Sequence, residues 1–268
     1  MSGTRQEEVR RPFRRYRSRT PTITTLFWLI KLAVSMAGAL LAGLASDSFG
    51  LGITTMLTIT AQTVVILVQF AVARYVAWLY WLTVGVTSLF GVLIVDNLTD
   101  TFEVPPDAAV VVLAVLLIGA FVGWYRTEQT LSIHTVDTAR RETFYWLVVS
   151  LTFALGTAVE RLGFEALGLA YTTVAVPCLA LAVAAWAGNR FTILGSGLAF
   201  WLAFASTQPL GVAVADLLAQ PRDVGGLGAD TAGVTCAVLT VIVAGVAYNG
   251  VTHRDDPSLE YATRSIQI

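Results

Sequence analysis

Four ionisable side chains interrupt the long apolar segments of this chain, and they have the greatest potential for chemistry. They are Lys31, Asp96, Glu160 and Asp216. A charged group surrounded by hydrocarbon is costly unless it is paired or hydrated, so such groups commonly mark substrate or ion pathways in membrane proteins. Carboxylates that share one path attract cations. These residue types therefore indicate transport of a cation or of another small solute.

Each of these residues also has a structural interpretation. Lys31 stands near the start of its apolar segment, where a lysine side chain can extend back to the aqueous boundary. Asp96 and Asp216 stand near the ends of theirs, either as hydrated interfacial groups or as the acidic lining of an outer vestibule. Glu160 cannot face its neighbour Arg161 on one helix, so it is either solvated or paired with another helix. The sequence leaves these alternatives open.

A second polar group precedes a proline. Thr207 and Gln208 stand directly before Pro209 inside an apolar segment. Proline removes a backbone donor and can kink a helix. Interrupted helices often form substrate sites in transporters, but proline is also simply more frequent in membrane helices. The motif predicts either a small polar pocket or a structural kink.

No arrangement of residues indicates catalysis. The sequence contains no nucleophile elbow, zinc-protease motif, phosphate-binding loop or dinucleotide-binding glycine pattern. Cys178 and Cys236 lie in apolar stretches and the two histidines lie in connecting segments, so their spacing predicts no metal cluster. We therefore expect no enzyme, no catalytic residues and no cofactor, and we leave the binding of a metal ion open.

Composition places these residues in a membrane. Of the 268 residues, 56% are apolar and 13% are charged, and the mean hydropathy is +0.70. Soluble domains carry about 25% charged residues. A helix that crosses the hydrocarbon layer needs about 20 apolar residues, and the apolar runs lack the alternation of a membrane β-barrel. The sequence predicts an all-α polytopic membrane protein with eight transmembrane helices, at residues 23–45, 51–73, 76–96, 108–125, 143–163, 167–187, 193–218 and 230–249.

The distribution of arginine predicts the orientation, because cytoplasmic loops carry an excess of basic residues. Fourteen arginines lie on the side of the N-terminal tail, namely Arg5, Arg10, Arg11, Arg14, Arg15, Arg17, Arg19, Arg74, Arg126, Arg140, Arg141, Arg190, Arg254 and Arg264. The other side holds Arg161 and Arg222. We expect a cell-membrane protein with both termini in the cytoplasm, with a basic tail (1–22), a membrane domain (23–249) and a C-terminal tail (250–268). The basic tail favours anionic lipid rather than nucleic acid.

Tryptophan shows the same one-sided distribution. All seven tryptophans lie at or near the predicted cytoplasmic boundary, namely Trp28, Trp78, Trp81, Trp124, Trp146, Trp186 and Trp201. Tryptophan is enriched where a membrane meets water. The pattern therefore predicts an interfacial aromatic belt.

The same landmarks occur four times along the chain. An aromatic residue and a tryptophan open each odd-numbered span, and a glycine follows ten residues after the tryptophan. The pairs are Phe27-Trp28, Tyr80-Trp81, Tyr145-Trp146 and Phe200-Trp201, and the glycines are Gly38, Gly91, Gly156 and Gly211. A period of two spans keeps every copy in one orientation. The sequence predicts four repeated helical hairpins, at about residues 23–75, 76–126, 143–190 and 193–249.

The repeated glycines predict close helix packing, because small residues let helix backbones approach in a membrane. The odd-numbered spans carry these glycines and all four ionisable candidates. The even-numbered spans are mostly Val, Leu, Ala and Ile, which suit lipid. We therefore expect the odd spans at the centre and the even spans at the periphery, and we leave the oligomeric state open.

With these repeats, the chain resembles a bacterial family of uncharacterised membrane-anchored proteins built from a repeat of unknown function. The resemblance runs from about Thr25 to Tyr248. Its motifs are Phe27-Trp28-Leu29-Ile30-Lys31, Tyr145-Trp146-Leu147 and, most clearly, Thr207-Gln208-Pro209-Leu210-Gly211 with Asp216-Leu217-Leu218 and Gly225-Gly226-Leu227. Asp96 and Asp216 keep the place of an acidic residue of the family, whereas Gly43 and Arg161 replace it and Gln208 replaces an arginine. The resemblance implies the fold and topology of a divergent member and no known activity.

Three classes of function remain. The first is a transporter or channel for a small solute or cation, with the odd spans around the path. The second is a membrane scaffold that does not transport, in which the glycines serve packing and the basic tail recruits lipid or partners. The third is an intramembrane enzyme, for which the sequence offers no positive feature.

Overall fold

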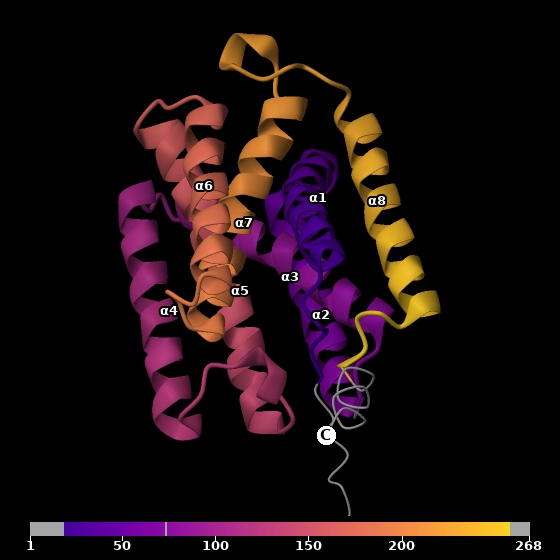
Figure 1. The fold of residues 1–268 in the computed structure, drawn as a ribbon. Helices are drawn as coiled ribbons and strands as arrows, with labels where there is room; N and C mark the ends of the chain where they lie inside the picture. Colours follow the sequence, from indigo (N-terminus) through magenta and orange to yellow (C-terminus); the bar gives the residue numbers. More distant parts are fainter. Residues whose placement is uncertain (1–18, 73, 258–268) are drawn as a thin grey trace, which may run out of the picture.

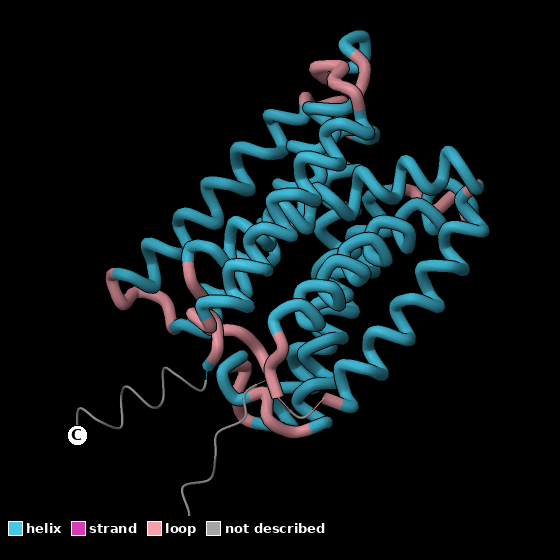
Figure 2. Tube along the Cα trace, turned by 90° about the vertical axis from the view of Figure 1, so that its right-hand side faces the viewer, coloured by secondary structure: helices cyan, strands magenta, loops and turns pink. Residues whose placement is uncertain are grey.

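The computed structural model describes residues 19–72 and 74–257, and these residues form a helical bundle without strands (Figures 1 and 2). The long helices are α1 (Thr25–Phe49), α2 (Leu51–Ala71), α3 (Ala77–Asp96), α4 (Pro106–Glu128), α5 (Ala139–Arg161), α6 (Tyr171–Arg190), α7 (Ser196–Ala219) and α8 (Thr231–Thr252). All eight are long and apolar enough to cross a membrane. The prediction of an all-α protein with eight transmembrane helices is confirmed.

Local sequence explains where these helices begin and end. The side chains of Thr24, Thr138 and Asp230 accept hydrogen bonds from the first turns of α1, α5 and α8, as N-cap residues do. Gly50 alone joins α1 to α2 with φ of 81°, a backbone conformation that favours glycine. Beyond α3 and α5, the chain continues as wider π-helical turns at Asn97–Thr101 and Leu162–Ala166.

The helices form two sets, one central and one peripheral. In the most apolar stretch of α7, 78% of the residues are buried, compared with 17% in α2 and in α8. In the other odd-numbered helices more than half of these residues are buried, whereas in α4 and α6 only 28% and 22% are. The prediction that the odd spans form the centre is confirmed.

The central helices form a closed ring in chain order. α1 packs on α3, α3 on α5, α5 on α7, and α7 returns to α1. Each peripheral helix packs most extensively on the central helix that follows it: α2 on α3, α4 on α5, α6 on α7, and α8 on α1. The sequence repeat therefore pairs α1 with α2, but the larger packing interfaces join neighbouring repeats.

Both ends of the described chain lie at one end of the bundle (Figure 1). The Thr22 amide donates a 2.9 Å hydrogen bond to the Asp255 carbonyl, and the Tyr75 hydroxyl donates to the Asp255 carboxylate. At the same end, Arg19 pairs with the buried Glu142. We call this end the terminus end and the opposite one the distal end.

Candidate functional site

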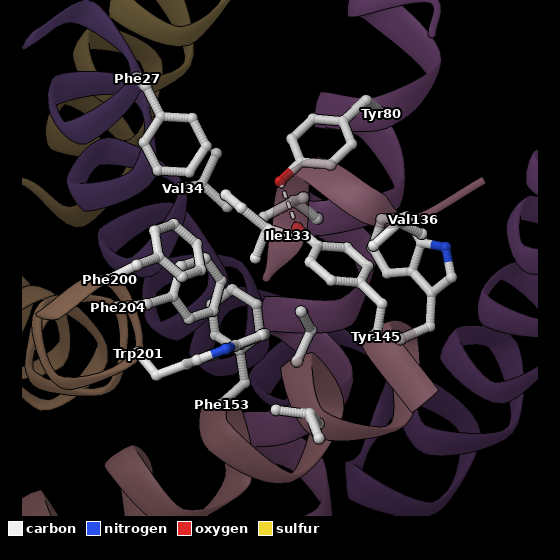
Figure 3. Close-up of a cluster of buried hydrophobic side chains, with 14 of the residues drawn as sticks. Phe27, Val34, Tyr80, Ile133, Val136, Tyr145, Phe153, Phe200, Trp201 and Phe204 are labelled. Carbon is white, nitrogen blue, oxygen red and sulfur yellow. Dashed lines mark hydrogen bonds between the residues drawn. The ribbon is translucent and has the colours of Figure 1, made fainter. Parts of the chain in front are cut away.

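The aromatic residues that open the four repeats meet in one layer inside the ring, at its terminus end. Phe27, Tyr80, Tyr145 and Phe200 are all nearly inaccessible to solvent. The Tyr80 and Tyr145 hydroxyls form a 2.6 Å hydrogen bond (Figure 3). This aromatic layer lies across the terminus end of the ring.

The neighbouring tryptophans tie the repeats together around this layer. Each contacts the aromatic residue of the preceding repeat, and the fourth repeat contacts the first. The ring-centroid distances are 5.3 Å for Phe27–Trp81, 5.8 Å for Tyr80–Trp146, 6.0 Å for Tyr145–Trp201 and 5.8 Å for Phe200–Trp28. The four repeats are thus arranged with cyclic pseudo-symmetry.

These contacts correct the expectation of an interfacial belt. Trp81, Trp146 and Trp201 are buried, since the repeat places them between central helices. Trp124 of α4 is also buried, and Trp28 is half-buried. Trp78 and Trp186 are 60% and 65% exposed. Only these two have the exposure expected of a residue at the membrane–water interface.

The repeated glycines form the next contacts along the ring. An added Cβ at Gly38 would overlap Ser88, at Gly91 Phe153, at Gly156 Gln208, and at Gly211 Ser35. Each partner stands three residues before the glycine of its own repeat. The glycines therefore lie at the crossings of neighbouring central helices.

Lys31 lies one helical turn beyond the aromatic layer and points into the ring. Its side chain is fully buried, and its Nζ donates a 3.0 Å hydrogen bond to Ser35 Oγ. The Nζ atom also lies 4.1 Å from the ring centroid of Phe153 and 4.5 Å from that of Phe204. This orientation excludes the interpretation in which Lys31 extends to the aqueous boundary.

Gln208 continues the polar contacts within the ring. It is fully buried, with its Oε1 3.5 Å from Ser88 Oγ and its Nε2 3.5 Å from Thr157 Oγ1. Thr207 instead donates to the carbonyl of Phe204 in its own helix, at 2.7 Å. α7 continues as a helix through Pro209. Of the two polar residues before this proline, only Gln208 directs a polar group toward another helix.

Charged residues gather at the distal end of the ring. Arg161 of α5 reaches across to the end of α3 and the π-helical turn beyond it, where it pairs with Asp96 at 3.5 Å and with Asp100 at 2.9 Å. It also pairs with Glu165 of its own chain segment at 2.9 Å. The sequence left open whether the charged residues Glu160 and Arg161 are solvated or paired with another helix. For Arg161, the structure shows pairing with a neighbouring helix. Asp96 is accordingly a paired residue, with its side chain only 18% exposed.

Glu160 is the most buried carboxylate of this distal cluster. Its side chain is 5% exposed, and its Oε1 has no hydrogen-bond partner among the described residues. Glu160 interacts electrostatically with Asp216 of α7 and with Asp96 of α3. Three repeats thus contribute carboxylates to one region, which we call the distal acidic cluster: Asp96, Asp100, Glu160, Glu165 and Asp216.

The structure divides the candidates from the sequence into two groups. Asp96, Glu160 and Asp216 come together at the distal end, whereas Lys31 and Gln208 lie deeper in the ring. The sequence reasoning missed Phe153, Phe204 and Thr157, which contact Lys31 or Gln208. Each of these residues stands a multiple of four positions after the aromatic residue that opens its repeat. Because residues four apart share a helix face, this spacing could have identified them from the sequence. Within the described ranges, no three His, Cys, Asp or Glu residues are placed to hold a metal ion.

Fold and repeat together define a polytopic helical membrane protein with four equivalent units around a ring. Residues 79–130 match the family described as Repeat of Unknown Function (DUF347). The match covers the second repeat and confirms the resemblance to an uncharacterised family built from this repeat. No curated protein and no solved structure matches the chain.

Proposed function

We propose that this protein moves a small solute, most simply a cation, across the membrane along the axis of the central ring. One observation carries the proposal: carboxylates from three repeats converge at the distal end of the ring, and buried Glu160 has an oxygen without a partner. A buried polar group of this kind is costly. A cation bound with its water would supply the missing partner and offset that cost, because no three carboxylates of the described residues are grouped closely enough to coordinate a metal ion by themselves.

The charge of the distal acidic cluster suits a cation. Its five carboxylates face one arginine, Arg161, which is already paired with Asp96, Asp100 and Glu165. Glu160 and Asp216 form no ion pair among the described residues. They are therefore the carboxylates best placed to bind a cation, and acidic groups at a pore entrance favour cations over anions.

The aromatic layer supports a gate at the other end. Phe27, Tyr80, Tyr145 and Phe200 are buried at the terminus end of the ring, so a solute that entered from the distal end would meet this aromatic layer. Opening would require neighbouring repeats to separate at the aromatic contacts. Rocking of repeats around a central site is a common mode of alternating access.

The arginine bias supports placement of the terminus end in the cytoplasm of a cell membrane. In this orientation, the distal acidic cluster faces outward and the aromatic layer lies on the cytoplasmic side. The predicted binding of anionic lipid concerns the basic tail, most of which lies outside the described residues.

Flux measurements on purified protein in lipid vesicles test the proposal. Na⁺, K⁺, Mg²⁺, Ca²⁺ and small organic amines would be screened, first with the unaltered protein and then with Glu160→Gln. The matched control is Asp107→Asn, an exposed carboxylate of α4 at the same end. Flux that falls in Glu160→Gln and persists in the control supports the proposal. Absence of flux for all these solutes would favour a scaffold, whose close glycine contacts the structure already provides.

A further inference from the structure

Lys31 is the only lysine of the chain, and its amine is enclosed by the ring. Ser35 Oγ accepts one hydrogen bond from Nζ, and the faces of Phe153 and Phe204 lie on other sides of it. Within residues 19–72 and 74–257, no carboxylate pairs with Lys31. Burial without a counter-ion favours the neutral amine, whereas the two aromatic faces offset part of the cost of the ammonium. The position therefore accommodates both protonation forms.

The charged residues that can influence Lys31 lie toward the distal end. On α1 itself, the only other charged residue is Asp47, which is exposed near the distal end of the helix. α2 and α8, which pack on α1, contain no Asp, Glu, Lys or Arg. α3 and α7 each contain one charged residue, Asp96 and Asp216, in the distal cluster. α5 contributes Glu160 to the distal acidic cluster, with Arg161 beside it, and carries Arg140, Arg141 and Glu142 at its opposite end.

Toward the terminus end, the charged residues of α5 form ion pairs: Arg140 and Arg141 pair with Glu128. Tyr80 and Tyr145 share a hydrogen bond in the aromatic layer, and Glu142 at the start of α5 pairs with Arg19. The electrostatic environment of Lys31 therefore changes mainly when the distal acidic cluster gains or loses charge.

The separation between the two sites allows such an effect. Phe153, which contacts Lys31, and Glu160 lie seven residues apart on α5, or about 10 Å along a helix. With an effective dielectric constant of about 20, two unit charges about 10 Å apart change each other's binding constant by roughly tenfold. For a separation set by this stretch of α5, we expect a charge change at Glu160 to shift the protonation equilibrium of Lys31.

Polar side chains also occupy the space between the two sites. Ser35 packs on Gly211, three residues after Gln208. Gln208 approaches Thr157, which stands three residues before Glu160 on α5. Because residues three apart lie on one helix face, hydroxyl and amide groups lead from the layer of Lys31 toward Glu160.

We infer that Lys31 is a proton-binding site whose proton is released when a cation occupies the distal acidic cluster. This inference rests on the proposed cation transport and names its coupling ion. A cation beside Glu160 cancels the negative charge that favours the ammonium. The ammonium then loses one proton to water, and Nζ keeps the electron pair as a neutral amine. By reciprocity, protonation of Lys31 weakens cation binding by the same factor, which is the basis of cation/proton exchange.

Because there is only one lysine, nitrogen NMR can observe this site directly. Protein labelled with ¹⁵N-lysine in lipid nanodiscs gives one side-chain signal, whose shift distinguishes the ammonium from the amine. Because the position accommodates both forms, we expect the signal to change from that of the ammonium to that of the amine within the pH range in which the protein stays folded. A signal that remains that of one form throughout this range would overturn the inference.

Glu160→Gln reproduces the loss of negative charge without any bound ion. We expect it to raise the ratio of amine to ammonium by about tenfold at a fixed pH. Asp107→Asn, which removes an exposed carboxylate at the same end of the bundle, should leave the ratio unchanged. An unchanged ratio in Glu160→Gln, with thermal unfolding like that of the unaltered protein, contradicts the coupling. If Glu160→Gln does not fold, Asp216→Asn takes its place, with a smaller increase expected.

This measurement is independent of the flux assay. A response of Lys31 to Glu160→Gln without flux of any ion would refute transport and leave the coupled proton site standing. Flux without such a response would refute the proton site alone.

Discussion

Gly211 of α7 packs directly on Ser35 of α1, so that the last repeat of the sequence contacts the first. The same relationship joins Gly38 to Ser88, three residues before Gly91. This contact turns a linear array of repeats into a closed ring. The stability of the ring therefore depends on a glycine that the sequence marks by its spacing from Trp201 and by its place in the motif Thr207-Gln208-Pro209-Leu210-Gly211.

The contact predicts a specific loss of stability. Gly211→Ala places a methyl group onto the Cβ of Ser35, and overpacking of this kind costs about 1–3 kcal/mol. Gly85→Ala is the matched control, because no atom lies near its added Cβ. Thermal unfolding in nanodiscs measures both, and Ser35→Gly should partly rescue Gly211→Ala. Equal stability of the two alanine variants would mean that the ring does not close at this crossing.

Arg161 is predicted to hold α3 and α5 together at the distal end. Arg161→Gln removes the partner of Asp96 and Asp100, and we expect a loss of about 1–3 kcal/mol, between the values for exposed and buried ion pairs. Arg140→Gln is the control, since Arg140 is 68% exposed in its pair with Glu128. Chemical unfolding of both variants is the measurement. A cost for Arg140→Gln as large as that for Arg161→Gln would contradict the special role of the distal pair.

Asp216 should matter more for transport than for folding. Its carboxylate has no ion-pair partner among the described residues, so Asp216→Asn should change the unfolding temperature little. Neutralisation removes an attraction for a cation of about 1–4 kcal/mol, enough to lower flux by tenfold or more. Flux and thermal unfolding would be measured on the same preparation, with Asp107→Asn as the control. Loss of folding in parallel with flux would instead assign Asp216 a structural role.

Stability at the terminus end should depend on pH through Asp255. Burial raises the pKa of this carboxyl above its ordinary value, and the hydrogen bond from Tyr75 opposes part of that increase. With a raised folded-state pKa, the contribution of Asp255 to stability is full below the ordinary carboxyl pKa of about 4. It is lost as pH rises through the raised value.

Tyr75→Phe tests this contact. Because the hydroxyl donates to the carboxylate, its removal should cost about 1–3 kcal/mol at neutral pH and less in acid, where the carboxyl is protonated. Tyr125→Phe is the control, because Tyr125 is 52% exposed. Unfolding free energies over a range of pH measure the effect. A cost for Tyr75→Phe that does not vary with pH would argue against a charged partner.

Orientation can be tested without any knowledge of the substrate. Reporter fusions after Asp107 and Gly228 should read outside, and fusions after Arg141 and Ile268 should read inside, because of the arginine bias. A fusion after Gly52 should also read outside. An outside signal at Ile268 would refute the proposed placement of the termini.

The sequence by itself determined the elements of this protein. Length and hydropathy were enough to find eight helices, because a span must satisfy its backbone within a helix of about 20 residues. The repeated spacing from Trp28 to Gly38 and its three copies identified the odd helices as the central set. The odd helices contain polar residues and the repeated glycines, whereas the even helices consist mostly of residues such as Val and Leu. This difference in composition distinguished the two sets.

Only the tertiary structure decided how these helices face one another. Lipid is as apolar as a protein core, so hydrophobicity does not reveal which side of a membrane helix is buried. For this reason the sequence could not show whether Lys31 points to the ring or to the boundary, or that Trp81 and Trp146 are buried. The pairing of Arg161 with Asp96 and the return of α7 to α1 likewise depend on helix rotation and on contacts distant in sequence. These are properties of packing, which the apolar pattern of a membrane protein does not encode.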